Sequence, residues 1–204
     1  MPLRLLKFLI PFTIYAGAFV SFNSKGWIIS LPLLFAWVFI PVMEIFIPPN
    51  PRNMNAAEQE LAKKNKGYDW LLYIVVIVQY AALYEFLVSM KYDTLTWYEI
   101  TGRIGVMGLL CGTFGINVGH ELGHRVNPFE QTLAKSLLLT SLYMHFFTEH
   151  NKGHHKRVAT PEDPSSARYG EPVYTFYFRT IISVSYTHLR AHETKANLVC
   201  RLLL

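Results

Sequence analysis

The chain of 204 residues has only two cysteines, Cys111 and Cys200, and only 16% of its residues are charged. Two isolated cysteines exclude a scaffold built on disulfides. Hydrophobic residues make up 51% of the chain and aromatic residues 15%, and the mean hydropathy is +0.22. A chain this apolar and this poor in charge is not an ordinary soluble domain, and no nucleic-acid partner is expected for it.

The apolar residues are concentrated in four segments close to the length that crosses a bilayer. They cover residues 5–22, 27–47, 70–90 and 101–118. The first segment is not interpreted as a signal peptide, because the second follows after four residues, as in a membrane hairpin. A shorter apolar run, residues 131–147, is expected to lie at the membrane interface. The fold class predicted is an all-α, polytopic membrane helix bundle that is truncated.

Basic residues predict the orientation of this bundle. The N-terminus carries Arg4 and Lys7, whereas the connections after the first and third apolar segments carry only Lys25 and Lys91. The connection between the second and third segments is the most basic; it holds Arg52, Lys63, Lys64 and Lys66. With basic segments inside, four crossings leave both the N-terminus and the end of the fourth segment in the cytoplasm.

Five of the eight histidines lie in two short clusters after the fourth apolar segment. The first cluster is HELGHR at residues 120–125, and the second is EHNKGHH at residues 149–155. On an α-helix, residues i and i+4 share one face, so His120 pairs with His124 and His150 with His154, with His155 one step round. Neutral imidazole is a good ligand for iron or zinc. The clusters therefore predict a cytoplasm-facing metal site, whereas His145 stands alone in an apolar run and is expected to be an interior histidine.

Two other classes of protein could use part of this pattern. The first cluster also matches HExxH, the zinc metalloprotease motif, in which Glu121 would be the general base. A catalytic zinc usually needs only three protein ligands, so a membrane protease leaves the second cluster unexplained. A metal transporter would place its ligands near the middle of the bilayer, whereas these histidines follow the ends of apolar segments.

The two clusters closely resemble the first two histidine boxes of the membrane alkane 1-monooxygenases, within the larger group of histidine-box membrane desaturases and hydroxylases. The second box is the more specific, because the resemblance continues through EHNKGHHKRVATPEDP at residues 149–164 and on to Glu171. The resemblance covers most of residues 1–182. A fatty-acid desaturase or hydroxylase of the same group is the main alternative.

The resemblance implies a non-haem di-iron monooxygenase of the bacterial inner (cytoplasmic) membrane that converts medium-chain n-alkanes to 1-alkanols. O₂ would be the co-substrate, the alkane would come from the bilayer, and electrons would come from NAD(P)H through rubredoxin reductase and rubredoxin. The implied ligands of the two iron ions are His120, His124, His150, His154 and His155. The family's remaining ligands lie further downstream, so this segment alone is expected to be inactive.

Charged residues close to the histidines have two interpretations each. Acidic residues there could accept the second ring N–H of a ligating histidine, or could be solvated charges. They are Glu121, Glu149, Glu162 and Asp163. Basic residues in and after the second cluster could attract an acidic electron carrier, or could simply belong to a positively charged membrane rim. They are Lys152, Lys156 and Arg157.

The last residues, 184–204, resemble a translated reading frame of a transposase-type sequencing adapter. We therefore expect natural sequence to end near Ile182. Residues 1–182 would be the N-terminal part of a membrane hydroxylase, with about four membrane helices and two histidine boxes, and residues 183–204 a non-native tail. His188 and His192 repeat the i, i+4 spacing. They are not counted as ligands, because they lie in this tail.

Overall fold

The computed structural model describes residues 5–48, 53–92 and 94–184, and within these ranges the chain forms helices and no strand. The all-α class predicted from the sequence is confirmed. The chain divides into two compact units, Met1–Leu142 and Tyr143–Leu204. The adapter-like tail, from residue 185 onward, lies outside the described residues, so the predicted boundary at residue 182 stays a prediction.

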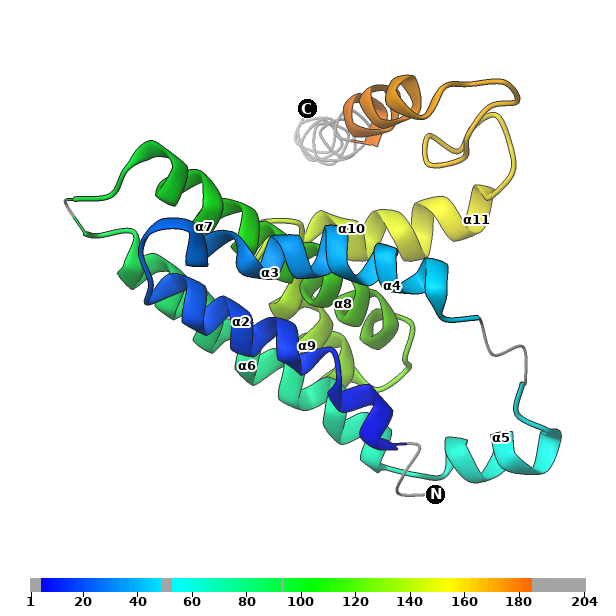
Figure 1. Cartoon of the computed structure of the whole chain (residues 1–204). Coiled ribbons are helices and arrows are strands. Elements are labelled where there is room, and N and C mark those ends of the chain that lie inside the picture. Colours follow the sequence, from blue (N-terminus) through cyan, green and yellow to red (C-terminus); the bar gives the residue numbers. More distant parts are fainter. Residues whose placement is uncertain (1–4, 49–52, 93, 185–204) are drawn as a thin grey trace, which may run out of the picture. The chain divides into compact units, whose positions relative to one another are not determined.

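Unit 1 contains most of the apolar sequence, wound into long helices (Figure 1). Its elements in chain order are η1 (Lys7–Leu9), α2 (Phe12–Phe22), η2 (Gly26–Ser30), α3 (Leu31–Leu34), η3 (Phe35–Phe39), α4 (Ile40–Phe46), α5 (Ala56–Lys63), α6 (Gly67–Ser89), α7 (Trp97–Leu110), η4 (Cys111–Ile116), α8 (Asn117–Gly123) and α9 (Pro128–Leu139). The elements η3 and η4 are π-helical turns, which insert an extra residue into an otherwise continuous helix.

Among the described residues, two helices are long and apolar enough to cross a membrane, Gly26–Phe46 and Gly67–Ser89. Only 11% of the first is buried inside the protein, so side chains such as Trp37 and Ile45 face outward. A helix that is apolar all round and exposed is suited to lipid rather than to water. The helix Lys7–Phe22 is apolar but shorter. The sequence-based topology of four crossings stays a prediction.

The centre of unit 1 contains a buried polar contact between its helices. Gln79 of α6 is fully buried, and its Oε1 accepts a hydrogen bond from the Tyr15 hydroxyl of α2 at 2.6 Å. The amide Nε2 of Gln79 donates to Thr140 Oγ1, at the end of α9, at 3.3 Å. An unsatisfied amide in an apolar core is costly, so these bonds fix how α2, α6 and α9 pack together.

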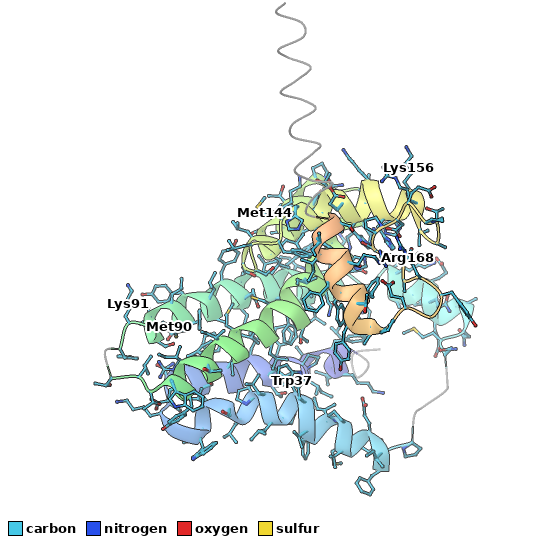
Figure 2. All side chains as sticks on the ribbon, turned by 90° about the horizontal axis from the view of Figure 1, so that it is seen from above. Trp37, Met90, Lys91, Met144, Lys156 and Arg168 are labelled. Carbon is cyan, nitrogen blue, oxygen red and sulfur yellow. The ribbon has the colours of Figure 1, made fainter. Side chains whose placement is uncertain are left out.

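One end of unit 1 is held together by Arg103 of α7. Its side chain is 1% exposed and donates to the carbonyl oxygens of Ser89, at the end of α6, and Ser24, after α2. Nearby, Glu99 accepts a hydrogen bond from the backbone N–H of Gly26 at 2.8 Å. The turn after α6, marked by Met90 and Lys91 in Figure 2, therefore lies at the same end as the turn after α2.

Replacing Arg103 with methionine should destabilise the bundle, because the buried Ser89 carbonyl and the partly buried Ser24 carbonyl lose their donor. We expect the free energy of unfolding to fall by about 3 kcal/mol, or roughly 10 °C in melting temperature. The measurement is thermal unfolding in detergent, with Lys91→Met as the control, since Lys91 is an exposed cation at the same end. Equal melting temperatures for the two variants would show that Arg103 is dispensable.

The opposite end of unit 1 is held by a second ionic cluster. Arg125 Nη1, just after α8, lies 2.6 Å from Asp69 Oδ1 in the first turn of α6 and 2.6 Å from Glu130 Oε1 in α9. The hydroxyl of Tyr73 donates to the same Glu130 oxygen at 2.7 Å. Asp69 lies in the first turn of α6, and Ser89 is the last residue of this helix. Because Arg125 contacts Asp69 and directly follows His124, the first histidine cluster lies at the end of unit 1 away from the turns at Ser24 and Ser89.

Unit 2 carries the second histidine cluster. Its short helices are α10 (His145–Thr148), η5 (Glu149–His154) and α11 (His155–Arg157), followed by a loop and a further helix over residues 173–184. We call residues 158–172 the acidic loop. Its backbone includes two residues with positive φ, Ala159 at 63° and Gly170 at 75°. Most of the loop has no regular backbone ladder, so side chains must hold it in place.

Candidate metal centre

The first histidine pair lies on one face of α8, as the i, i+4 spacing predicts. The Nε2 atoms of His120 and His124 are 2.8 Å apart. Two ligands at right angles on one ion, each with a bond of about 2.1 Å, are about 3 Å apart. The spacing of this pair therefore fits coordination of one metal ion.

Close packing against α9 positions this pair. A Cβ atom added to Gly119, the residue before His120, would lie 3.2 Å from Leu138 Cγ and 3.3 Å from the Ala134 carbonyl oxygen. Glycine thus lets α8 approach the backbone of α9. Arg125 directly follows His124, and its ion pairs with Asp69 and Glu130 hold the end of α8 in place. Sequence reasoning did not assign this role to Arg125, because Asp69 is 56 residues away along the chain.

The second cluster departs from the α-helical pairing expected from the sequence. Residues Glu149–His154 form a π-helix. A π-helix bonds residue i to residue i+5, so His150 and His155 come onto one face. Their Nε2 atoms are 3.0 Å apart, whereas the His150 and His154 rings stack with centroids at 5.4 Å. The expected close pair of His150 with His154 is therefore replaced by His150 with His155.

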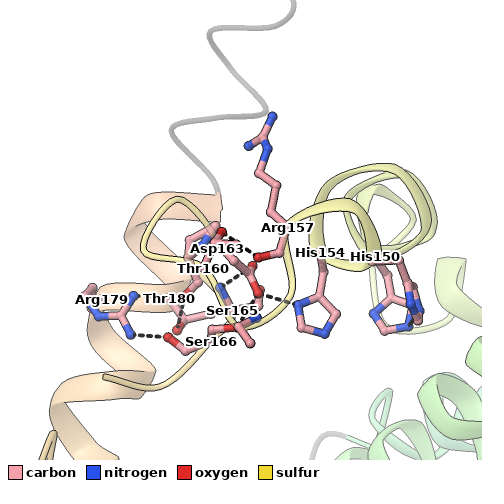
Figure 3. Close-up of polar contacts among 12 residues, drawn as sticks. His150, His154, Arg157, Thr160, Asp163, Ser165, Ser166, Arg179 and Thr180 are labelled. Carbon is pink, nitrogen blue, oxygen red and sulfur yellow. Dashed lines mark hydrogen bonds and ion pairs between the residues drawn. The ribbon is translucent and has the colours of Figure 1, made fainter. Parts of the chain in front are cut away.

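His154 instead contacts Asp163 of the acidic loop (Figure 3). Its Nδ1 lies 2.7 Å from Asp163 Oδ2, and the carboxylate is 2% exposed. Burial alone would raise the pKa of Asp163, but hydrogen bonds from Ser166 Oγ, the Ser165 N–H and His154 outweigh it, so the pKa is lowered. An ionised carboxylate only accepts, so Nδ1 donates to it, and in the neutral ring Nε2 then carries the lone pair that a metal needs.

The other three acidic candidates differ in their surroundings. Glu121 is 3.9 Å from Arg125. Glu162 is exposed, and its carboxylate accepts hydrogen bonds from its own backbone N–H and from Thr160, which lower its pKa, as does the nearby charge of Arg157. Glu149 begins the π-helix. For Glu121, Glu149 and Glu162, acceptance of a ligand N–H stays a prediction. Lys152, Lys156 and Arg157 are all exposed, as a docking surface requires, and their role also stays a prediction.

A cavity of about 240 Å³ lies inside unit 2, next to the second cluster. His150 and His154 line it together with apolar side chains, among them Phe146 and Ile181. His145 lines it as well, and its ring packs edge to face on Tyr143 with centroids 4.6 Å apart. His145 is thus closer to the second cluster than its isolated place in the sequence suggested.

Arg179, from the helix over residues 173–184, fastens the acidic loop (Figure 3). Its Nε and Nη2 lie 2.7 Å from the two carboxylate oxygens of Glu171, a bidentate ion pair. The same guanidinium donates to the carbonyl oxygens of Pro164 and Ser166, both at 3.0 Å. We call these four contacts the Arg179 clasp. Sequence reasoning did not single out Arg179, because nothing in the local pattern joins it to the histidines.

The clasp predicts a specific pH dependence of stability. Hydrogen bonds from Arg179 and from the Arg168 backbone N–H lower the pKa of Glu171 from 4.5 to about 2. Because the folded-state pKa is the lower one, the stabilisation is fully present above pH 4.5 and is lost as the pH falls toward 2. The difference in melting temperature between wild type and Glu171→Gln should therefore shrink over this range. A difference that stays constant with pH would contradict this assignment.

Each unit thus offers one close pair of imidazole nitrogens that could hold a metal ion, His120 with His124 and His150 with His155. His154 adds a third imidazole in unit 2, with its tautomer fixed by Asp163. An all-imidazole donor set supported by a buried carboxylate fits iron or zinc. The chemistry of the donors is therefore that of a metal site.

Comparison with known proteins agrees with this chemistry. Residues 102–197 match the family model described as fatty acid desaturase. The chain is 37% identical to an alkane 1-monooxygenase of Pseudomonas putida over 161 residues, 78% of this chain and 40% of the relative. It is 35% identical to an alkane 1-monooxygenase of Ectopseudomonas oleovorans over 181 residues, 88% of this chain and 45% of the relative. For alkane 1-monooxygenase 1 of Alcanivorax borkumensis the identity is 34%, over 88% of this chain and 44% of the relative.

These matches show that the chain is similar to the histidine-box membrane proteins of the fatty acid desaturase type. Within that class the relatives it is similar to are alkane 1-monooxygenases, as the resemblance of its two histidine boxes indicated. The chain spans less than half the length of these relatives.

Proposed function

We propose that the full-length protein carrying this chain is a membrane monooxygenase that hydroxylates the terminal methyl group of medium-chain n-alkanes. The observation that carries the proposal is His154, whose Nδ1–H is held by the buried Asp163 so that Nε2 can ligate. Such a histidine–carboxylate contact is typical of metal ligands. It lies in the more specific of the two histidine boxes that resemble those of the alkane 1-monooxygenases.

The proposed protein binds two iron ions through the histidines of its two boxes. His120 and His124 would contribute from unit 1, and His150, His154 and His155 from unit 2. The remaining ligands would come from sequence beyond this chain, so this segment alone should be inactive. When bound, a redox-active iron pair supplies the O₂ activation that an unactivated C–H bond requires. The residues of this chain hold the ligand atoms, fix the tautomer of His154 and keep apolar walls around the site.

The overall reaction consumes two electrons. One oxygen atom of O₂ enters a terminal C–H bond to give a 1-alkanol, and the other is reduced to water with two electrons and two protons. We propose that NAD(P)H supplies these electrons through rubredoxin reductase and rubredoxin. The exposed Lys152, Lys156 and Arg157 would attract an acidic carrier. A cytoplasmic site in a bacterial inner membrane would give that carrier access.

The test is oxidation of a medium-chain n-alkane under ¹⁸O₂ by the purified full-length protein with rubredoxin, its reductase and NAD(P)H. We expect two irons per protein and 1-alkanol that carries one ¹⁸O atom. Alcohol with oxygen from water would refute oxygenation. Zinc-dependent peptide cleavage without O₂ consumption would instead establish the HExxH protease alternative based on His120, Glu121 and His124.

A second candidate is a fatty-acid desaturase or hydroxylase of the same group. The observation in its favour is the match of residues 102–197 to the fatty acid desaturase model. The same ¹⁸O₂ assay distinguishes the two when alkane and acyl substrates are supplied in parallel. Turnover of only the acyl substrate would favour this alternative.

A further inference from the structure

The Arg179 clasp differs from an exposed surface ion pair, because its side chains are largely buried and it fixes several groups of the acidic loop at once. The Arg179 side chain is 18% exposed and the Glu171 side chain 8%, and the guanidinium makes four contacts within 3.0 Å. Two of these contacts go to the Glu171 carboxylate and two to carbonyl oxygens. The planar guanidinium, with its five N–H donors in fixed directions, can make all four at the same time. Thr180, the next residue, adds a hydrogen bond to the Pro164 carbonyl at 2.9 Å.

The clasped carbonyl groups flank the carboxylate that contacts His154. Pro164 directly follows Asp163. Ser166 donates its hydroxyl to Asp163 Oδ2, and the Ser165 N–H donates to Oδ1 at 2.9 Å. The Ser166 hydroxyl also accepts from the Ala159 N–H at 3.0 Å, which draws the start of the acidic loop to the same point. Contacts therefore run without interruption from Arg179 through the acidic loop to Asp163 and His154 (Figure 3).

We propose that Arg179 is a positioning residue for the metal centre, which acts by holding the acidic loop so that Asp163 orients the His154 ring. This rests on the proposed function, in which His154 ligates a metal. Without the clasp, a loop held by few backbone hydrogen bonds gains conformational freedom. Asp163 then no longer presents one fixed acceptor to Nδ1, and Nε2 loses its fixed direction.

The experiment is an anaerobic titration of the metal-free full-length protein in detergent with Co²⁺, followed by visible absorption. Arg179→Met should bind Co²⁺ roughly 10–100-fold more weakly than wild type. Arg179→Lys should rescue little, because a single ammonium group cannot span both carboxylate oxygens and two carbonyls. Arg168→Met is the matched control: Arg168 is an exposed arginine of the same loop, and its backbone N–H, which donates to Glu171, is retained. It should bind like wild type.

A double-mutant cycle with Asp163→Asn separates positioning from general stability. If Arg179 acts through Asp163, Arg179→Met should weaken Co²⁺ binding little further in the Asp163→Asn background. Glu171→Gln, which keeps an acceptor oxygen, provides a milder variant if Arg179→Met does not fold. Chymotrypsin cleavage at the exposed Tyr169 should accelerate in Arg179→Met, which reports loosening of the loop without any metal.

The outcomes are distinguishable. Wild-type Co²⁺ binding with an unchanged affinity in Arg179→Met, or fully additive effects in the cycle, would overturn the positioning role and leave the proposed function intact. A wild-type protein that binds neither Co²⁺ nor Fe²⁺ would overturn the proposed function and, with it, the positioning role. Weaker, non-additive binding together with faster loop cleavage would support both.

Discussion

Replacing His120 or His154 with alanine in the full-length protein should abolish alkane hydroxylation and lower metal affinity by more than about 100-fold. Each change removes an imidazole that we propose as a metal ligand, which should cost more than loss of an outer partner such as Asp163. His120 is held in unit 1 by the close packing of Gly119 on α9, and His154 in unit 2 by Asp163. Loss of metal from both variants would show that both units contribute to metal binding.

His145→Ala is the informative comparison for these variants. His145 lies in the same unit as His154 and lines the cavity beside it, but in our proposal it is not a ligand. The His145→Ala variant should therefore keep its iron and retain measurable turnover if it folds. Iron content by metal analysis and alkanol formation are measured on the same preparations. A His154→Ala protein with full iron content, or a His145→Ala protein without iron, would contradict the assignment of ligands.

Hydropathy and local spacing predicted those parts of the structure that depend on neighbours along the chain. The helices Gly26–Phe46 and Gly67–Ser89 follow from apolar runs, because a chain in lipid must satisfy its backbone groups internally. The approach of His120 to His124 follows from helical periodicity. The second cluster did not follow this rule, since a π-helix at Glu149–His154 shifts the pairing by one residue. Residue spacing alone does not reveal a π-helical turn.

Contacts between distant residues were beyond prediction for a different reason. Asp163 was among four acidic candidates of equal standing in the sequence, and only the path of the acidic loop brings it to Nδ1 of His154. Arg125 reaches Asp69 across 56 residues, and Arg179 reaches Pro164 across 15. The residues that orient the proposed ligands thus come from tertiary packing, whereas the ligands themselves can be read from a motif.

The structure of unit 1 predicts which of its two ends faces the cytoplasm and which faces the periplasm. Arg103 places the turns after α2 and α6 at one end, and the Arg125 cluster places the first histidine cluster and the start of α6 at the other. The basic connection between α4 and α6 enters α6 at this second end and should remain in the cytoplasm. Lys25, in the turn after α2, should therefore face the periplasm, and Lys64, at the end of α5, the cytoplasm.

Single cysteines at these two exposed positions give the measurement. In a background with Cys111→Ser and with residues 183–204 removed, Lys25→Cys should react with a membrane-impermeant thiol reagent in intact cells whose outer membrane is permeabilised. Lys64→Cys should react only after the inner membrane is opened, which also serves as the control for its accessibility. The reverse pattern would place His120 and His124 on the periplasmic side, away from NAD(P)H-driven reductants. The proposed electron supply through rubredoxin would then fail, because electrons from the cytoplasm could not reach the site by a soluble carrier.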